Sequence, residues 1–322
     1  MSQSNQCAVK PESLLRRFEG YFLSRAIESL VIGKIILSLL GPKPRDGYLL
    51  SIDRTNWKAG KKTINVLVVS VIFNSVGYPI YWRQLPKSTK QGNSSTQHRI
   101  AAFRAILKIL SPDDIFAVIG DREFTGEKWQ KWLDQKNIPY VLRIKSNIHI
   151  NQEKAEDWFY NHMSSGMVTV FELQVYACRK QLASGESLIL ISNSIKPRFM
   201  ARLYKLRWGI EMLFSHAKKR GLNWEDTHIK DDKKLQALAG VIALAFTISH
   251  LWGMKLEETK KTPIKKHGYK AISFFKKGFR AIRQLLYENE SSSLGRSFMR
   301  FVVNLPEQNE FMGFCARIKI IG

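Results

Sequence analysis

The stretch YLLSIDRTNWKAGKKTINVLVVSVIF, residues 48–73, contains two runs of apolar, β-branched residues that decide the expected fold. YLLSID (48–53) and KTINVLVVSVIF (62–73) are typical of strands, and the polar residues between them predict a loop. A third run, YPIYWRQL (78–85), follows the turn residues NSVG. The three segments therefore predict an antiparallel meander.

Downstream of the meander, helix and strand patterns alternate. We expect a helix over 99–110, a buried strand at IFAVIGD (115–121), a helix at GEKWQKWLDQKN (126–137) and a strand at PYVLRIK (139–145). VTVFELQVYA (168–177) and SLILISN (187–193) predict two more strands, in a more polar region that covers 146–196. This order is typical of an α/β domain with a mixed sheet.

The two ends of the chain are expected to be helical, over 12–40 and from 198 onward. LQALAGVIALAFTISHLW (235–252) approaches the length of a membrane span but contains Gln236, Thr247, Ser249 and His250. We therefore expect a buried core helix there and no membrane partner.

The charge is strongly positive. The 322 residues include 51 Lys and Arg and 27 Asp and Glu, which gives a net charge of +24. Such an excess repels itself unless a polyanion neutralises it, and nucleic acids are the commonest polyanions. A basic soluble protein or a membrane-surface binder is the alternative.

The cysteines and the first residues of the chain indicate the cellular compartment of the protein. Cys7, Cys178 and Cys315 are scattered, without the paired spacing of a disulfide framework or a zinc site. The first residues lack the apolar run of a signal peptide. These features predict a cytoplasmic protein, associated with the nucleoid when it binds DNA.

Two aspartates follow apolar runs. Asp53 closes YLLSID and Asp121 closes IFAVIGD, where Gly120 leaves room for a close backbone approach. A charged residue at the end of a buried strand lies at the rim of the sheet, where ligands bind. An arginine follows each aspartate, which favours a shared site over two ordinary turn residues.

The segment YKLRWGIEMLFSHAKKRGLN (204–223) places one glutamate among basic residues. At about 100° per residue, Tyr204, Arg207, Glu211 and Lys218 share one stripe of a continuous helix. A solvated row of salt bridges is the alternative interpretation.

Asp53, Asp121 and Glu211 are thus the candidate catalytic and metal-binding residues. Two Asp and one Glu are hard oxygen ligands for Mg²⁺, with Mn²⁺ as a possible substitute. Two such ions about 3.5–4 Å apart can activate an attacking oxygen and stabilise a leaving one.

The candidate DNA-binding residues are basic or aromatic. Arg207 and Lys218 offer a fork and a point charge to phosphates, and Tyr204 can donate a hydrogen bond or stack. Arg143 and Lys145 share a face of the strand after Asp121. Residues 265–283 hold seven basic residues and no acid, typical of either a phosphate-tracking segment or a solvated helix.

These motifs resemble a known family. The pattern Y-x₂-R-x₃-E-x₆-K at Tyr204, Arg207, Glu211 and Lys218 resembles the tyrosine–arginine–glutamate–lysine motif of bacterial DDE transposases of the insertion-sequence-four type. LLSIDRTNW (49–57) and AVIGDREF (117–124) resemble the blocks around the family's two aspartates, and the likeness covers roughly residues 48–290.

The resemblance implies a ribonuclease-H-like mixed sheet flanked by helices. The catalytic domain would cover 47–290 with a β insertion at about 146–196, between a helical N-terminal region (1–46) and a C-terminal tail (291–322). Only 52 residues precede Asp53, which predicts a shortened DNA-binding part.

The resemblance also implies a reaction. Mg²⁺-dependent cleavage at the terminal inverted repeats of a transposon would be followed by attack of the freed 3′-hydroxyl on target DNA. Two chains would act as a dimer on paired double-stranded DNA ends. The alternatives are a nuclease that does not join strands and a transposase-derived DNA-binding protein that does not cut.

Overall fold

The structure is a computed structural model, which describes residues 28–86, 94–218, 221–266, 268–285 and 293–304. The helix expected over 12–27, Cys7, Cys315 and the tail beyond residue 304 lie outside these residues. By compactness the chain divides into two units. The sheet unit comprises the described residues of Pro42–Trp57 and Thr63–Met212, and the helical unit those of Met1–Gly41, Lys58–Lys62 and Leu213–Phe311.

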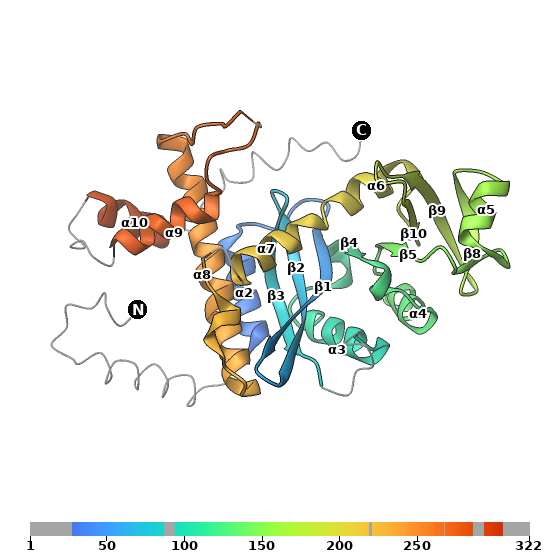
Figure 1. The fold of residues 1–322 in the computed structure, drawn as a ribbon, viewed down its shortest axis with the longest axis horizontal. Helices are drawn as coiled ribbons and strands as arrows, with labels where there is room; N and C mark the ends of the chain where they lie inside the picture. Colours follow the sequence, from blue (N-terminus) through green and yellow to red (C-terminus); the bar gives the residue numbers. More distant parts are fainter. Residues whose placement is uncertain (1–27, 87–93, 219–220, 267, 286–292, 305–322) are drawn as a thin grey trace. The chain divides into compact units, whose positions relative to one another are not determined.

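An eight-stranded sheet dominates the sheet unit, in the order β3-β2-β1-β4-β5-β10-β9-β8 (Figure 1). β1 pairs in parallel with β4, and β4 with β5, whereas β10 pairs antiparallel with β5. The strands are β1 (Tyr48–Ala59), β2 (Lys62–Phe73), β3 (Val76–Gln84), β4 (Ile115–Gly120), β5 (Tyr140–Ile144), β8 (Ser165–Val170), β9 (Leu173–Gln181) and β10 (Ser187–Ser192), with a separate pair β6 (His149–Ile150) and β7 (Glu153–Lys154). The predicted mixed α/β sheet is confirmed.

Helices cover this sheet and form the second unit. They are α2 (Ser29–Leu39), α3 (Thr96–Ile106), α4 (Glu127–Gln135), α5 (Ala155–Asn161), α6 (Pro197–Lys205), α7 (Trp208–Lys218), α8 (Asp232–Thr259), α9 (Phe274–Leu285) and α10 (Ser293–Asn304), with short 3₁₀ turns η2 (Pro112–Asp114), η3 (Arg122–Phe124) and η4 (Trp224–Thr227).

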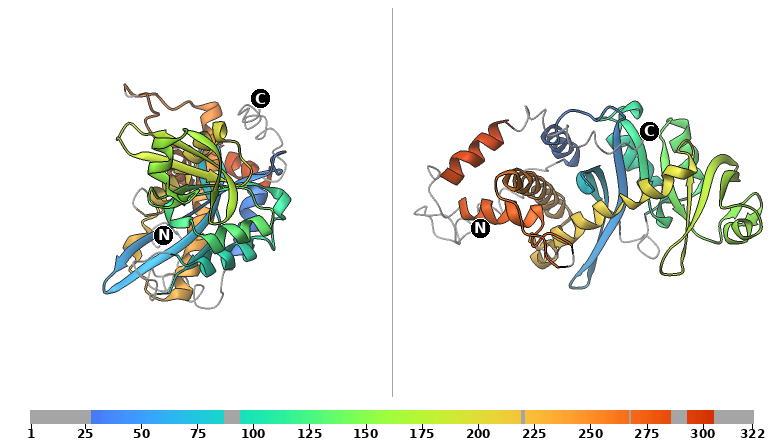
Figure 2. Two further views of the ribbon diagram at one scale, coloured as in Figure 1. Left: turned by 90° about the vertical axis from the view of Figure 1, so that its right-hand side faces the viewer. Right: turned by 90° about the horizontal axis from the view of Figure 1, so that it is seen from above.

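The core of the sheet unit lies beneath α6. Met200, Leu203 and Tyr204 of this helix pack on strand residues that include Ala117 and Ile119. On the other side of β4 and β5 lie α3 and α4 (Figures 1 and 2). The rings of Phe103 in α3 and Trp129 in α4 meet edge to face, with centroids 5.2 Å apart. Burial on both faces explains why β4 reads as an unbroken apolar run.

Two strand predictions need correction. The expected loop at 54–61 is mostly strand, because Thr55, Trp57 and Ala59 alternate into the protein and extend β1 to Ala59. VTVFELQVYA is two strands, β8 and β9, joined by a tight turn at Phe171 and Glu172 (φ 52° and 63°). Strands β8–β10 extend the main sheet, and the predicted boundaries of the domains and of the insertion stay predictions.

The helical unit is built around α8, which packs against α2 and α9. The apolar stretch of α8 has the length and composition of a membrane span. Among the helices of the described residues, α8 is the sole one with such a stretch. Two-thirds of that stretch is buried by other parts of the protein, which is typical of a core helix in a soluble protein.

Candidate active site

Two neighbouring strands deliver the two aspartates. β1 and β4 run parallel, with Ile52 opposite Gly120, so Asp53 and Asp121 directly follow two paired residues of adjacent strands. A Cβ atom at Gly120 would lie 3.0–3.1 Å from side-chain atoms of Phe124, Ile52 and Leu142, so glycine permits this close packing. Asp53 lies within β1 and does not end it, but pairing with β4 stops at Ile52, which places Asp53 at a rim as expected.

The glutamate comes from a break between two helices. The continuous helix predicted from Tyr204 to Lys218 is wrong: Tyr204 belongs to α6, Arg207 to a turn, and Glu211 to the first turn of α7. The backbone N–H of Arg207 donates to Tyr204 O at 3.0 Å, and that of Ile210 to Arg207 O at 3.0 Å, both tight i→i+3 bonds.

Close packing on the β2–β3 turn explains the break. A Cβ atom at Gly209 would lie 2.9 Å from Ser75 O, and one at Gly77 would lie 3.0 Å from Ile210 Cα. Two glycines thus let α7 begin directly against the hairpin. This contact fixes where Glu211 projects, because Glu211 follows Ile210 immediately.

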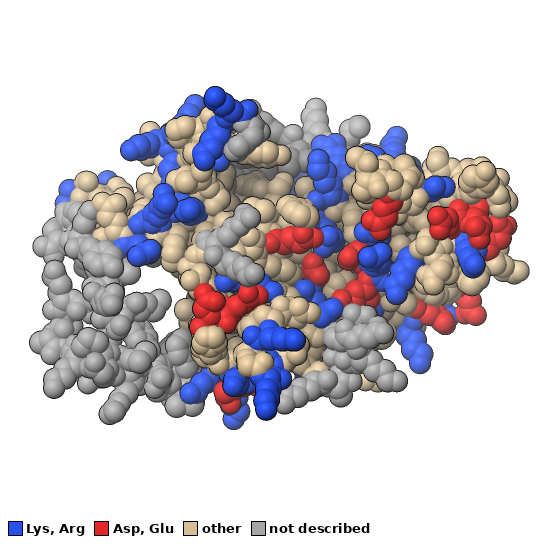
Figure 3. Space-filling model, in the orientation of Figure 1, with Lys and Arg blue, Asp and Glu red and all other residues tan. Residues whose placement is uncertain are grey.

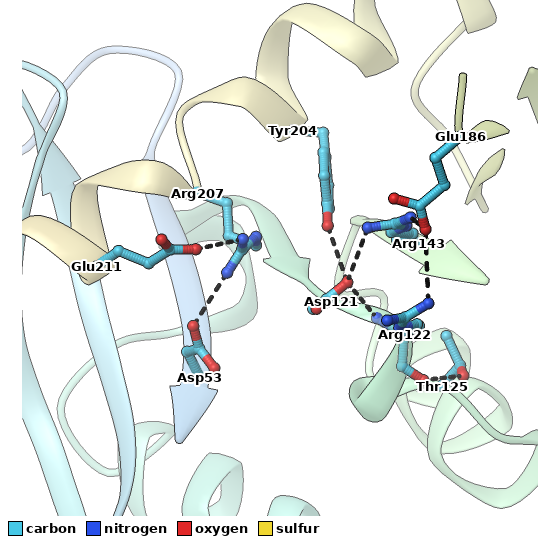
Figure 4. A network of polar contacts seen from close by, with 9 residues as sticks. All are labelled: Asp53, Asp121, Arg122, Thr125, Arg143, Glu186, Tyr204, Arg207 and Glu211. Carbon is cyan, nitrogen blue, oxygen red and sulfur yellow. Dashed lines mark hydrogen bonds and ion pairs between the residues drawn. The ribbon is translucent and has the colours of Figure 1, made fainter. Parts of the chain in front are cut away.

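Arg207 joins two of the three acids. Its Nη1 donates to Asp53 Oδ2 at 3.0 Å, and its Nη2 donates to Glu211 Oε1 at 2.6 Å (Figure 4). The Arg207 side chain is only 15% exposed. The structure therefore brings Asp53 and Glu211, 158 positions apart in sequence (211 − 53), to one guanidinium.

Asp121 lies in the second half of the network. Its Oδ1 accepts hydrogen bonds from the Tyr204 hydroxyl at 3.1 Å and from the Arg122 backbone N–H at 2.8 Å. Arg143 Nη1 lies 3.9 Å away and also pairs with Glu186, which pairs with Arg122 as well (Figure 4). Tyr204 and Arg143 thus reach the site through Asp121.

Electrostatics show that the three carboxylates interact. Burial raises the pKa of Asp53 to about 6, with further increases from the charges of Glu211 and Asp121, while the Arg54 N–H and Arg207 oppose the shift. Burial also raises the pKa of the Tyr204 hydroxyl to about 12, aided by the Asp121 charge. The site therefore favours an added positive charge beside Asp53.

The donor set suits a hard divalent cation, because all three acids offer oxygen ligands. Arg207 already places a positive charge between Asp53 and Glu211. In the described part of the chain, no three His, Cys, Asp or Glu side chains lie close enough together to hold an ion.

Two predicted DNA-binding lysines belong to other segments of the chain. Lys145 is exposed, immediately after β5. Lys218 ends α7 in the helical unit and pairs with Glu225 at 2.9 Å, both side chains being 20% exposed. A shared stripe of four residues does not form, because the helix breaks after Lys205.

Two acids near the site were not predicted. Glu123 accepts hydrogen bonds from Arg54 Nε at 3.0 Å and from the N–H and Oγ of Ser94 at 2.9 and 3.1 Å. It thereby ties β1, just after Asp53, to the turn after Asp121. Glu186 holds Arg122 and Arg143. The arginines after each aspartate were visible in the sequence, but their distant partners were not.

Replacing Arg207 by methionine should destabilise the protein by about 1–3 kcal/mol at pH 7, because Asp53 and Glu211 lose their shared donor. The loss should shrink near pH 5, where Asp53, with its pKa near 6, takes up a proton. Urea denaturation at both pH values measures this. Arg104→Met, at an exposed position on α3, serves as the control; equal losses at both positions would contradict the pairing.

Comparison with known protein families identifies the domain. The family described as the transposase DDE domain matches residues 44–248, more than half of the chain. No curated protein matches the sequence. Transposases with this domain generally use divalent metals, and the domain is that of DNA-cleaving and DNA-joining enzymes.

Among solved structures, a cryo-EM structure of the piggyBac transposase synaptic complex with hairpin DNA is similar, at 16% identity and a TM-score of 0.39. The alignment covers 86% of this chain and 58% of that one. This likeness is too weak to transfer residues or architecture. The match to the domain over residues 44–248 is sufficient by itself: the chain belongs to the transposase DDE domain family.

Proposed function

We propose that this protein is a DNA transposase of the insertion-sequence-four type, which cleaves transposon ends and joins them to target DNA. The single observation that carries the proposal is the network in which Arg207 links Asp53 and Glu211 beside Asp121. Family membership supports a transposase, and the charge of +24 supports DNA as the partner.

We further propose that β1–β5 form a ribonuclease-H-like core. Three features support it: the neighbouring order β3-β2-β1-β4-β5, the parallel pairing of β1, β4 and β5, and an acid after the paired parts of β1 and of β4. In this arrangement Asp53 and Asp121 flank one rim of the sheet.

Asp53, Asp121 and Glu211 would hold Mg²⁺, or Mn²⁺ in its place. When bound, such ions supply positive charge for the attacking and leaving oxygens of a phosphodiester. Arg207 would leave Asp53 and Glu211 and present its fork to the DNA phosphate. Tyr204 would keep Asp121 oriented through its hydroxyl, and Arg143, Lys145 and Lys218 would contact the backbone.

Strand transfer is the test that separates the proposed reaction from its alternatives. The gene's flanking inverted repeats give the end sequence, and a duplex with a pre-cut 3′-hydroxyl end is offered with Mg²⁺ and plasmid target. We expect joined products that require both the metal and the 3′-hydroxyl. Cleavage without joining would indicate a nuclease, and binding without either would indicate a DNA-binding protein. The number of chains per paired end follows from the mass of the complex, for which we expect a dimer.

A further inference from the structure

The segment between α8 and α9 folds into a small hairpin in the helical unit. Ile264 and Lys270 form an antiparallel bridge, and the N–H of Lys265 donates to Tyr269 O at 2.9 Å. The N–H of Gly268, with φ +82°, donates to Lys265 O at 2.9 Å and closes the turn. We call residues 260–271, apart from residue 267, the basic hairpin.

One acid fastens the basic hairpin to both helices. Glu257, in the last turns of α8, accepts from the N–H and Oγ1 of Thr262 at 3.0 and 2.6 Å and from Lys277 Nζ of α9 at 2.6 Å. It also pairs with Lys270, and its side chain is 13% exposed. Burial alone would raise the pKa of Glu257, but these hydrogen bonds lower it far below its usual range. The hairpin is therefore held in a defined position.

The charge of this region is of one sign. Residues 260–283 contain nine Lys and Arg and no acid. Lys276, Arg280 and Arg283 share the exposed face of α9, spaced over about 10 Å. In Figure 3, basic side chains gather over the segment that links α8 to α9, without acidic ones among them. The hairpin itself exposes Lys260, Lys261, Lys265 and Lys266.

An exposed aromatic ring accompanies these lysines. Tyr269, near the turn, is 76% exposed. A merely solvated basic surface has no need of such a ring, whereas an aromatic side chain among cations can stack on a base or donate to a phosphate. The apolar side of α9 is not available to a membrane, because Phe275 and Gly278 are buried.

From these observations we infer that the basic hairpin and the exposed face of α9 bind the sugar–phosphate backbone of DNA, as a contact separate from the acidic site. This inference rests on the proposed function, since it assumes a DNA substrate. It assigns the contact to a surface that lies wholly within the helical unit.

The test compares two double variants of the full chain. Lys265→Ala with Lys266→Ala removes two charges from the hairpin. As the control, Lys128→Ala with Lys136→Ala removes two exposed charges, one from α4 and one from the residue that caps its C-terminal end. Binding of a short duplex of arbitrary sequence is measured over a range of salt concentrations. The hairpin variant should bind about tenfold or more weakly at ~0.1 M salt, with a slope of log K on log salt that is smaller by about 1.8. The control should keep the wild-type slope, and Tyr269→Ala should weaken binding at unchanged melting temperature.

The outcomes separate the two proposals. Wild-type protein without salt-dependent DNA binding would contradict the proposed function. Wild-type binding with an unchanged slope in the hairpin variant would overturn this inference alone. If the hairpin variant lost binding to phosphatidylserine vesicles but kept wild-type DNA binding, the surface would be assigned to membranes. That result would also overturn the inference of a DNA contact.

Discussion

Replacing Asp53 by asparagine should stabilise the folded protein at neutral pH while abolishing strand cleavage. Burial and the charges of Glu211 and Asp121 raise the pKa of Asp53 from 3.8 to about 6, so ionising this carboxyl is unfavourable in the folded state. A shift of about two units corresponds to at most about 3 kcal/mol. We expect about 1–2 kcal/mol, since asparagine also gives up the ion pair with Arg207.

The pH dependence follows from the direction of the shift. The folded protein holds a proton on Asp53 that the unfolded chain releases near pH 4, so stability falls as pH rises from about 4 to about 6. The Asp53→Asn variant should lack this part of the decline. Denaturation with urea at pH 4.5 and pH 7 measures the difference. Asp157→Asn, at an exposed position on α5, is the control; a variant less stable than wild type at pH 7 would contradict the raised pKa.

Activity and metal binding should respond in the opposite sense. Without the Asp53 carboxylate, Mg²⁺-dependent cleavage should fall about a thousandfold or more, since metal-assisted charge stabilisation contributes several kcal/mol. Mg²⁺ should also raise the melting temperature of the wild type more than that of the variant. Cleavage at the wild-type rate by Asp53→Asn would remove this residue from the site.

Replacing Gly253 by alanine should disrupt the helical unit. The helices α8 and α9 cross with backbones in contact: a Cβ atom at Gly253 would lie 1.8 Å from Phe274 O, and one at Gly278 would lie 1.9 Å from Ser249 O. Rigid backbone cannot yield as a side chain does, so the helices must separate. We expect a loss of about 3 kcal/mol or more, although alanine favours the helix by about 1 kcal/mol.

A glycine-to-alanine substitution at Gly41 serves as the control for the steric clash at Gly253. Gly41 has no atom within 4 Å of a built Cβ, and only its φ of +88° opposes alanine. Gly41→Ala should therefore cost about 1 kcal/mol. The two variants are compared by urea denaturation, with far-ultraviolet circular dichroism to follow helix content. Equal stability of the two would show that α8 and α9 can separate without penalty.

Local patterns were sufficient for much of the sheet. The strand predicted at 62–73 coincides with β2, and the apolar run before Asp121 coincides with β4. These elements depend on β-branched and apolar residues that are neighbours in sequence. The β8–β9 turn was missed for a local reason, because Phe171 and Glu172 adopt positive φ angles that usually require Gly or Asn.

The break before Glu211 could not be predicted from periodicity. Residues 204–218 have a continuous helical pattern, and the break arises only because Gly209 packs on the backbone of Ser75, far away in the sequence. The Arg207 bridge has the same origin. The ion pair of Arg207 with Glu211 could be predicted from their i,i+4 spacing in the sequence. The ion pair of Arg207 with Asp53 could not, because Asp53 is remote in the sequence.

The acids, the apolar runs before the two aspartates and the net charge of +24 are all apparent from the amino-acid sequence without a structure. The position of one arginine between Asp53 and Glu211, and the contacts of Glu257 with the basic hairpin, became visible in the folded protein alone. The two kinds of feature differ in distance along the chain. Apolar runs depend on residues that are neighbours in sequence, whereas ion pairs between remote residues depend on sheet register and on close backbone contacts at glycines.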